Sequence, residues 1–234
     1  PAVIPSEHFN TVLWAGNDAD DRSISGVGFQ PDFVWNKARN RSGGDGHYLY
    51  DAIRGATKVL YSNAANAEAT EGNALQAFES DGFQMGSDSN SNSSSYNYVA
   101  WNWKANGVGA SNTAGSINTT KTSANVDAGF SIISYTGNDT SGATIGHGLS
   151  KAPEMVLVKD TANSSRNWNG YHSGIDASSP QDYTIRLNSS NARLETAANA
   201  WNDTAPSASL VTLGGGTQVN YPGDIYIAYC FHSV

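Results

Sequence analysis

The segment FNTVLWAGND at residues 9–18 recurs as FSIISYTGND at residues 130–139, and this internal repeat is the main indication of the fold. The repeat continues with further pairs of blocks in the same order along the chain. They are ISGVGF and IGHGL at 24–29 and 145–149, PDFVWNK and PEMVLVK at 31–37 and 153–159, and YVAWNW and YIAYCF at 98–103 and 226–231. Blocks that recur in one order indicate that a single structural unit occurs twice.

Each block is a short run of β-branched and aromatic residues that ends at turn residues, which is the pattern of a β-strand. Helical periodicity is nearly absent; it is suggested only at 63–77, where Gly72 interrupts it, and at 188–201. We therefore predict an all-β fold of tandem antiparallel β-sandwich repeats of the jelly-roll, lectin-like type. The closing strands at 98–103 and 226–231 are apolar on both faces, which predicts central strands.

The repeat also sets the expected domain boundaries. Residues 6–104 form the first sandwich repeat and residues 128–234 the second. Residues 105–127 are rich in Gly, Ser, Thr and Asn and are predicted to be a linker, in which Ile117 and Val126 mark a possible short edge strand. The alternative is one sandwich shared by both copies, because a single large β-sandwich can need this length.

Composition excludes several classes of function. The chain carries 13 Lys and Arg against 21 Asp and Glu, a formal charge of −8, and has no basic run. It therefore lacks the electrostatic signature of a nucleic-acid-binding protein. No apolar stretch approaches the ~18 residues that would predict membrane insertion. Cys230 is the one cysteine, so no disulfide can form within the chain.

A further group of blocks carries a resemblance to a known family. They are GVGFQPDFVW at 26–35, HYLYDAIRGATKVLYSN at 47–63, LQAFESDGFQMG at 75–86, YVAWNWKANG at 98–107, FSIISYTGND at 130–139, TIGHGLSKAPEMVLVK at 144–159 and YIAYCFHSV at 226–234. In these blocks the chain resembles the repeated domains of marine bacteriophage (cyanophage-type) tail-fibre and virion structural proteins, which are regarded as concanavalin A-like lectin-type β-sandwiches.

The resemblance implies a structural protein of the virion surface, and thus an extracellular location. It further implies contacts with other virion proteins and a homo-oligomer, a trimer if the protein is a fibre. It supplies no catalytic residue. We expect such a protein to take part in recognition of a glycan on the host surface.

Loop aromatics of the second copy are the predicted ligand-binding residues. Sugar rings stack on exposed indole and phenol faces, while amides and imidazoles bond to hydroxyl groups. The candidates are Trp168, Tyr171, His172, Trp201 and Asn202. The acidic chain favours neutral or amide-bearing sugars as the target. The alternative is that the aromatic rings are core residues, as is usual in sandwiches.

The densest acidic cluster contains Asp18, Asp20 and Asp21. Carboxylate oxygens are the ligands that Ca²⁺ prefers, so this cluster is the candidate metal site, with a solvated turn as the alternative. No other cofactor is predicted.

Two alternative functions remain open. A glycan-degrading hydrolase on a lectin-like fold would need two facing carboxylates. The nearest approach in the sequence, Glu79 and Asp81, stops at a turn, so we predict that the protein is not an enzyme. The other alternative is a purely structural fibre or capsid-decoration module without a ligand.

Overall fold

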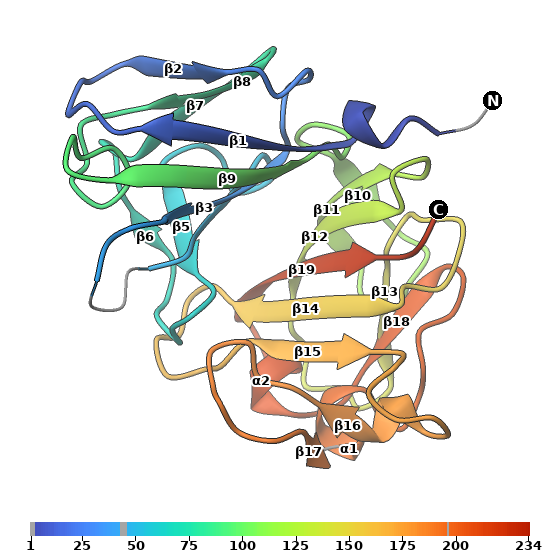
Figure 1. The fold of residues 1–234 in the computed structure, drawn as a ribbon. Coiled ribbons are helices and arrows are strands. Elements are labelled where there is room, and N and C mark those ends of the chain that lie inside the picture. The colour runs from blue at the N-terminus through green and yellow to red at the C-terminus, as the bar shows by residue number, and fades with distance from the viewer. Residues whose placement is uncertain (1–2, 43–45, 196) are drawn as a thin grey trace. The chain divides into compact units, whose positions relative to one another are not determined.

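The computed structural model describes residues 3–42, 46–195 and 197–234, whose regular secondary structure is mainly antiparallel β-sheet (Figure 1). Strands make up 40% and helices 5%, so the prediction of an all-β fold is confirmed. The chain forms two compact units: Pro1–Asn63 with Glu68–Gly107 is unit 1, and Ala64–Ala67 with Val108–Val234 is unit 2. No helix of the described residues is long and apolar enough to cross a membrane.

Unit 1 consists of a six-stranded sheet in the order β1-β9-β3-β4-β5-β6 and a three-stranded sheet in the order β2-β8-β7. The 3-10 turn η1 (Pro5–Glu7) precedes them. The strands are β1 (Phe9–Ala15), β2 (Arg22–Ser25), β3 (Phe33–Ala38), β4 (Tyr48–Asp51), β5 (Lys58–Tyr61), β6 (Ala69–Thr70), β7 (Leu75–Glu79), β8 (Gly82–Met85) and β9 (Asn97–Trp103). One apolar cluster contains side chains from both sheets, so the core of unit 1 lies between them.

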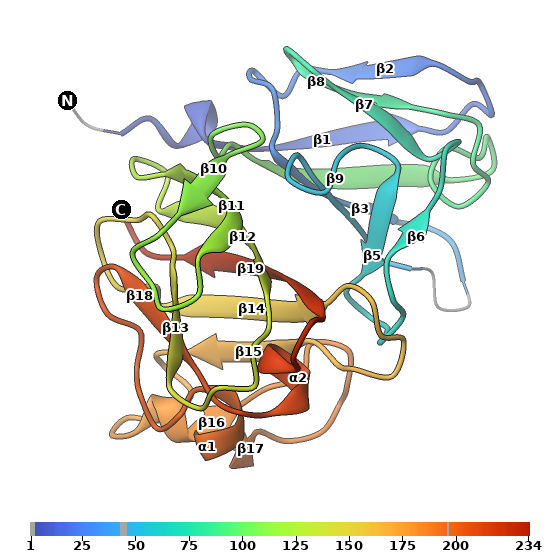
Figure 2. The same cartoon turned by 180° about the vertical axis from the view of Figure 1, so that it is seen from behind.

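Unit 2 has a six-stranded sheet in the order β10-β11-β12-β19-β14-β15. Its strands are β10 (Ala110–Asn112), β11 (Thr119–Asn125), β12 (Phe130–Thr136), β14 (Met155–Asp160), β15 (Asn169–His172) and β19 (Ile225–Phe231). The pair β13 (Ala143–Gly146) and β18 (Leu210–Leu213) lies across this sheet and shares its core cluster (Figure 2). Smaller elements are η2 (Pro180–Asp182), β16 (Tyr183–Thr184), β17 (Leu194–Glu195), α1 (Ala197–Ala200) and α2 (Thr217–Asn220).

The repeated blocks form the same three-stranded arrangement in each unit. In unit 1, the closing strand β9 pairs with β1 on one side and β3 on the other. In unit 2, β19 pairs in the same way with β12 and β14. The five consecutive buried residues of β19 confirm the prediction of a central strand buried on both faces. Strand β9 is buried at most positions but leaves Trp101 and Trp103 half-exposed.

The predicted linker at 105–127 is not a plain linker. Residues 110–112 and 119–125 form β10 and β11, and β11 pairs with β12 in the sheet of unit 2. The strand forms with Ala124 as its one apolar residue, because its threonines suit extended backbone and find partners near the sheet edge. The Thr119 hydroxyl, for example, accepts the Asn112 backbone N–H at 3.0 Å.

Candidate functional site

The predicted stacking residues of the second copy are mostly buried. Trp168, Tyr171 and Trp201 have exposed fractions of 0%, 3% and 1%. Trp168 stacks on Tyr229 with ring centroids 6.1 Å apart. Trp201 donates its Nε1–H to Thr184 Oγ1 over 3.1 Å, inside the core of unit 2. A ring without an exposed face cannot stack on a sugar, so the prediction of a stacking platform at these three residues is wrong.

The two other predicted ligand-binding residues lie nearer the surface. His172 is exposed at the end of β15, and its Nδ1 accepts the Gly174 backbone N–H at 2.9 Å. Asn202 follows α1 in a turn with φ of 51°, and its Oδ1 accepts the Ser141 hydroxyl at 2.6 Å. The His172 side chain therefore serves a local turn, while that of Asn202 ties its turn to the distant Ser141. Neither residue lines the two cavities described below.

The predicted Ca²⁺ site is wrong for the described residues. Over residues 3–42, 46–195 and 197–234, no three His, Cys, Asp or Glu side chains gather around a possible metal position. The Asp18 carboxylate accepts the Ser94 backbone N–H at 3.1 Å, and hydrogen bonds from Ser94 lower its pKa. Asp20 accepts the Gln76 side-chain amide at 2.8 Å. The turn therefore directs its carboxylates to separate partners, and the alternative of a solvated turn holds.

An aromatic cavity of about 260 Å³ lies in unit 1, lined by Trp35, His47, Trp101 and Trp103. The pairing of strands creates it. Trp35 on β3 lies directly opposite Trp101 on β9, and residues two apart on a strand, such as Trp101 and Trp103, share one face. The rings of Trp35 and Trp101 meet edge to face, with centroids 6.2 Å apart and an interplanar angle of 79°. The cavity therefore has indole walls that stand nearly perpendicular to each other.

The apolar surface continues onto the edge strand β1. Phe9 lies opposite Trp103 with ring centroids 4.8 Å apart, and Thr11 lies opposite Trp101. Phe9 is 39% exposed, and Leu13 on the same face of β1 is 61% exposed. This strip adds aromatic surface and one hydroxyl group beside the cavity.

A comparison of the two copies explains why the cavity exists only in unit 1 at these positions. By strand register, Tyr229 in unit 2 corresponds to Trp101, and Trp168 corresponds to His47. In unit 2 the indole of Trp168 stacks on Tyr229 and fills the space. In unit 1 the smaller imidazole of His47 leaves it open. This exchange of Trp for His is visible in the aligned blocks, whereas the sequence prediction placed the stacking residues in the second copy.

His47 is held as a neutral donor at the rim of this cavity. Its Nδ1 accepts the Trp35 Nε1–H at 3.0 Å, so the proton of the neutral ring lies on Nε2. Burial, and then the charge of Lys37, lower the pKa of His47 below its usual 6.5. At neutral pH the cavity wall is thus uncharged.

The lowered pKa of His47 predicts a pH dependence. The folded state favours the neutral His47 ring. The stability that this neutral ring contributes is therefore fully present above pH 6.5, and it is lost as the pH falls from 6.5 through the lowered pKa of the folded state. Protonation of Nδ1 also removes the acceptor for Trp35. An NMR titration of the His47 ring should therefore give a pKa below 6.5. A pKa at or above that of a histidine in a short peptide would contradict the neutral assignment.

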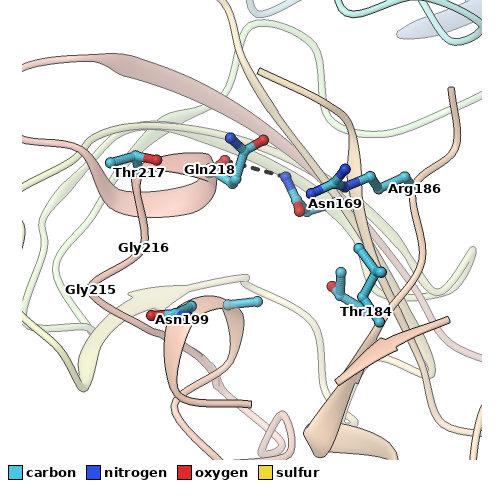
Figure 3. Close-up of a pocket in the computed structure, with 10 residues that line it drawn as sticks. Asn169, Thr184, Arg186, Asn199, Gly215, Gly216, Thr217 and Gln218 are labelled. Carbon is cyan, nitrogen blue, oxygen red and sulfur yellow. Dashed lines mark hydrogen bonds between the residues drawn. The ribbon is translucent and has the colours of Figure 1, made fainter. Parts of the chain in front are cut away.

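A second, larger cavity lies in unit 2. It has a volume of about 420 Å³ and is lined by Asn169, Thr184, Arg186, Leu194, Asn199, Ala200, Gly215, Gly216, Thr217 and Gln218 (Figure 3). Amides, hydroxyls and one guanidinium dominate this wall, in contrast to the aromatic cavity of unit 1.

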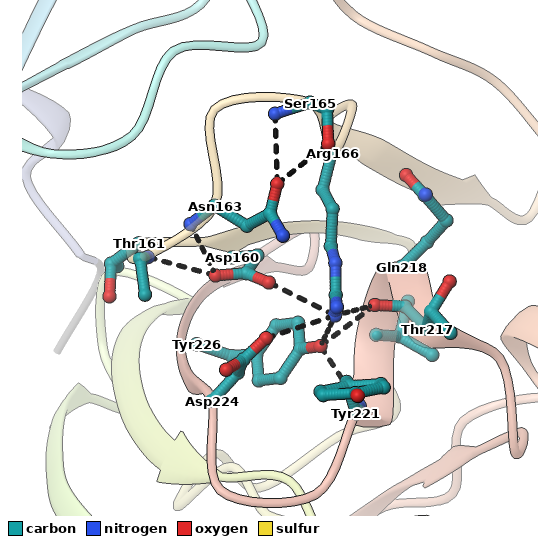
Figure 4. A network of polar contacts seen from close by, with 12 residues as sticks. Asp160, Thr161, Asn163, Ser165, Arg166, Thr217, Gln218, Tyr221, Asp224 and Tyr226 are labelled. Carbon is teal, nitrogen blue, oxygen red and sulfur yellow. Dashed lines mark hydrogen bonds and ion pairs between the residues drawn. The ribbon is translucent and has the colours of Figure 1, made fainter.

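An ion cluster in unit 2 brings two carboxylates to one guanidinium (Figure 4). Arg166 Nη1 lies 3.1 Å from Asp160 Oδ2 and 3.1 Å from Asp224 Oδ2, and it donates to the Tyr226 hydroxyl at 2.9 Å. Burial raises the pKa of Asp160, whose side chain is inaccessible to solvent. Because one guanidinium engages both carboxylates, the cluster is a structural element and does not have the open arrangement of a hydrolase.

Comparison with known proteins gives a family but no described relative. No curated protein and no solved structure matches the chain. A family model described as "Domain of unknown function (DUF7483)" matches residues 4–234, which is nearly the whole chain. The chain therefore belongs to the DUF7483 family.

Proposed function

We propose that this protein is a structural module of a phage tail fibre or virion surface that binds neutral host-surface glycans through the aromatic cavity of unit 1. The observation that carries the proposal is the cavity itself, with Trp35 and Trp101 as perpendicular walls and His47 Nε2–H as a donor. The sequence resemblance described above supports the virion setting. On this proposal the two units are tandem lectin-like jelly-roll sandwiches.

The size and polarity of the cavity favour one sugar ring. Its volume of about 260 Å³ lies just below the roughly 300–1,000 Å³ typical of pockets for drug-sized ligands. The apolar face of a pyranose suits an indole wall, and its hydroxyl groups suit the His47 donor and the nearby Thr11. With His47 neutral, none of the four lining residues is charged, so nothing in the wall favours an ionic sugar.

We expect each contact to be weak. One ring in a small open cavity gives a Kd of about 1 mM, or roughly −4 kcal/mol. A homo-oligomeric fibre that presents several copies to one cell surface gains affinity by avidity, because the later binding events are intramolecular. Attachment to other virion proteins would then hold the copies in a common orientation.

Filling the cavity is the sharpest test. His47→Trp introduces the same residue type as Trp168, which fills the corresponding position in unit 2. Binding is measured on an array of neutral glycans with the protein displayed multivalently. The substitution should reduce this binding at least tenfold. The melting temperature should change little, because the new ring occupies space already present. The matched control is His172→Trp, which adds the same ring at an exposed histidine of unit 2 and should leave glycan binding unchanged.

Two results on the array would reject the proposal. Equal binding by the wild type and His47→Trp would show that the cavity does not hold the sugar. No binding of the multivalent wild type to any neutral glycan would favour the purely structural module without a ligand.

A further inference from the structure

The cavity of unit 2 is built by segments that approach each other closely. The Gly214 and Gly216 backbone N–H groups donate to Ala200 O and Asn199 O, at 2.8 and 2.9 Å. A Cβ atom at Gly216 would lie 2.2 Å from Asn199 O, so this position accepts only glycine without a shift of the backbone. The opposite wall comes from β15 and β16, whose backbones are joined through Gly170 and Ile185. The cavity is thus a defined part of the fold.

Arg186 brings an uncompensated charge to this cavity. It lines the cavity together with the buried Thr184, two residues earlier, while Ile185 between them is 36% exposed. Arg186 Nε is buried and has no hydrogen-bond partner among the described groups. By contrast, the guanidinium groups of Arg166 and Arg193 each contact a carboxylate. A half-buried guanidinium with an unmet donor is costly unless a ligand completes it.

The rest of the wall is neutral and polar. Arg186 is the one charged residue of the ten that line the cavity. Arg186 and Thr184 stand on one side of the space, and Asn199 and Thr217 on the other (Figure 3). Trp201 donates its Nε1–H to the Thr184 hydroxyl at 3.1 Å and so fixes that hydroxyl. Such a wall can bond to several hydroxyl groups while it neutralises one negative charge.

We propose that this cavity is a second binding site, which takes a carboxylate-bearing sugar residue. The guanidinium of Arg186 pairs with the carboxylate, since its planar fork matches that group, and the surrounding amides and hydroxyls bond to the ring hydroxyl groups. The volume of about 420 Å³ lies within the range of small-molecule sites. The choice of a sugar rests on the proposed function, but the site does not depend on the aromatic cavity of unit 1.

The test compares galacturonate, galactose and inorganic phosphate by NMR titration of the full chain. Galacturonate should shift the backbone amide signals of Gly215 and Gly216 in a saturable manner and bind at least tenfold more tightly than galactose or phosphate. Arg186→Gln should weaken galacturonate binding at least tenfold. The matched control, Arg193→Gln, should leave it unchanged, because that guanidinium pairs with Asp176 outside the cavity.

Each contrary outcome overturns the inference. If galactose bound as tightly as galacturonate, the carboxylate would have no role in binding. If phosphate bound as tightly as galacturonate, the cavity would be a simple anion site and not a sugar site. Should Arg186→Gln fail to fold, Arg186→Lys keeps the charge but loses the planar fork, and it must still weaken galacturonate binding. His47→Trp should leave galacturonate binding unchanged, so failure of this site and failure of the aromatic cavity are distinguishable.

Discussion

Replacing Arg166 with methionine is expected to lower the free energy of unfolding of unit 2 by about 3–5 kcal/mol at neutral pH. The substitution leaves the Asp160 carboxylate, which is inaccessible to solvent, without its guanidinium partner. The neighbouring Asp224 carboxylate loses the same partner. A loss of this size lowers the melting temperature by on the order of 10 °C. Urea denaturation and thermal melting measure both quantities.

The matched control for Arg166→Met is Arg193→Met in the same unit. Arg193 pairs with Asp176 at 2.9 Å, but its side chain is 41% exposed, so the loss should be about 1 kcal/mol or less. The cost of Arg166→Met should also shrink at acid pH, because protonation of Asp160 removes the unpaired charge. Equal costs for the two variants would contradict the structural role of the cluster.

Trp201→Ala is expected to cost about 3–5 kcal/mol, because it removes a large ring from the centre of the core of unit 2. The ring is 1% exposed and meets Tyr171 edge to face, with centroids 6.0 Å apart. Trp201→Phe should cost less, since it keeps one aromatic ring in the core and loses only the rest of the indole and the bond to Thr184. Denaturation by urea gives the difference.

This prediction separates a core residue from a binding residue. A half-exposed tryptophan provides the comparison, and Trp101→Ala should cost clearly less than Trp201→Ala. If Trp201→Ala retained the wild-type melting temperature and lost only glycan binding, the buried placement of Trp201 would be wrong.

The repeat predicted the shared arrangement of strands because it preserves the pattern that pairing requires. The blocks at 98–103 and 226–231 each became the strand between two others. Local composition was less informative. The helical pattern at 63–77 contains β6 and the start of β7, and the predicted linker contains β10 and β11. Pairing with neighbouring strands overrode weak local preferences in these segments.

The sequence predicted which residue types could form a binding site, but it did not predict where in the fold their side chains would be accessible. The sequence shows that Trp168 and Trp101 are aromatic, and both lie in or beside strands. It does not show which face each side chain takes or which ring covers it. Trp168 covers Tyr229, whereas the corresponding His47 is too small to cover Trp101. That difference follows from strand register, which fixes the partners across the sheet.

The indole N–H signals of the six tryptophans provide the most direct test of glycan binding in unit 1. Neutral monosaccharides are titrated at millimolar concentrations into ¹⁵N-labelled protein and followed by NMR. For a sugar that binds, the signals of Trp35 and Trp101 should shift and saturate, while those of the buried Trp14, Trp168 and Trp201 stay in place. Shifts confined to the buried tryptophans, or no shift of Trp35 and Trp101 with any neutral sugar, would contradict glycan binding in the aromatic cavity.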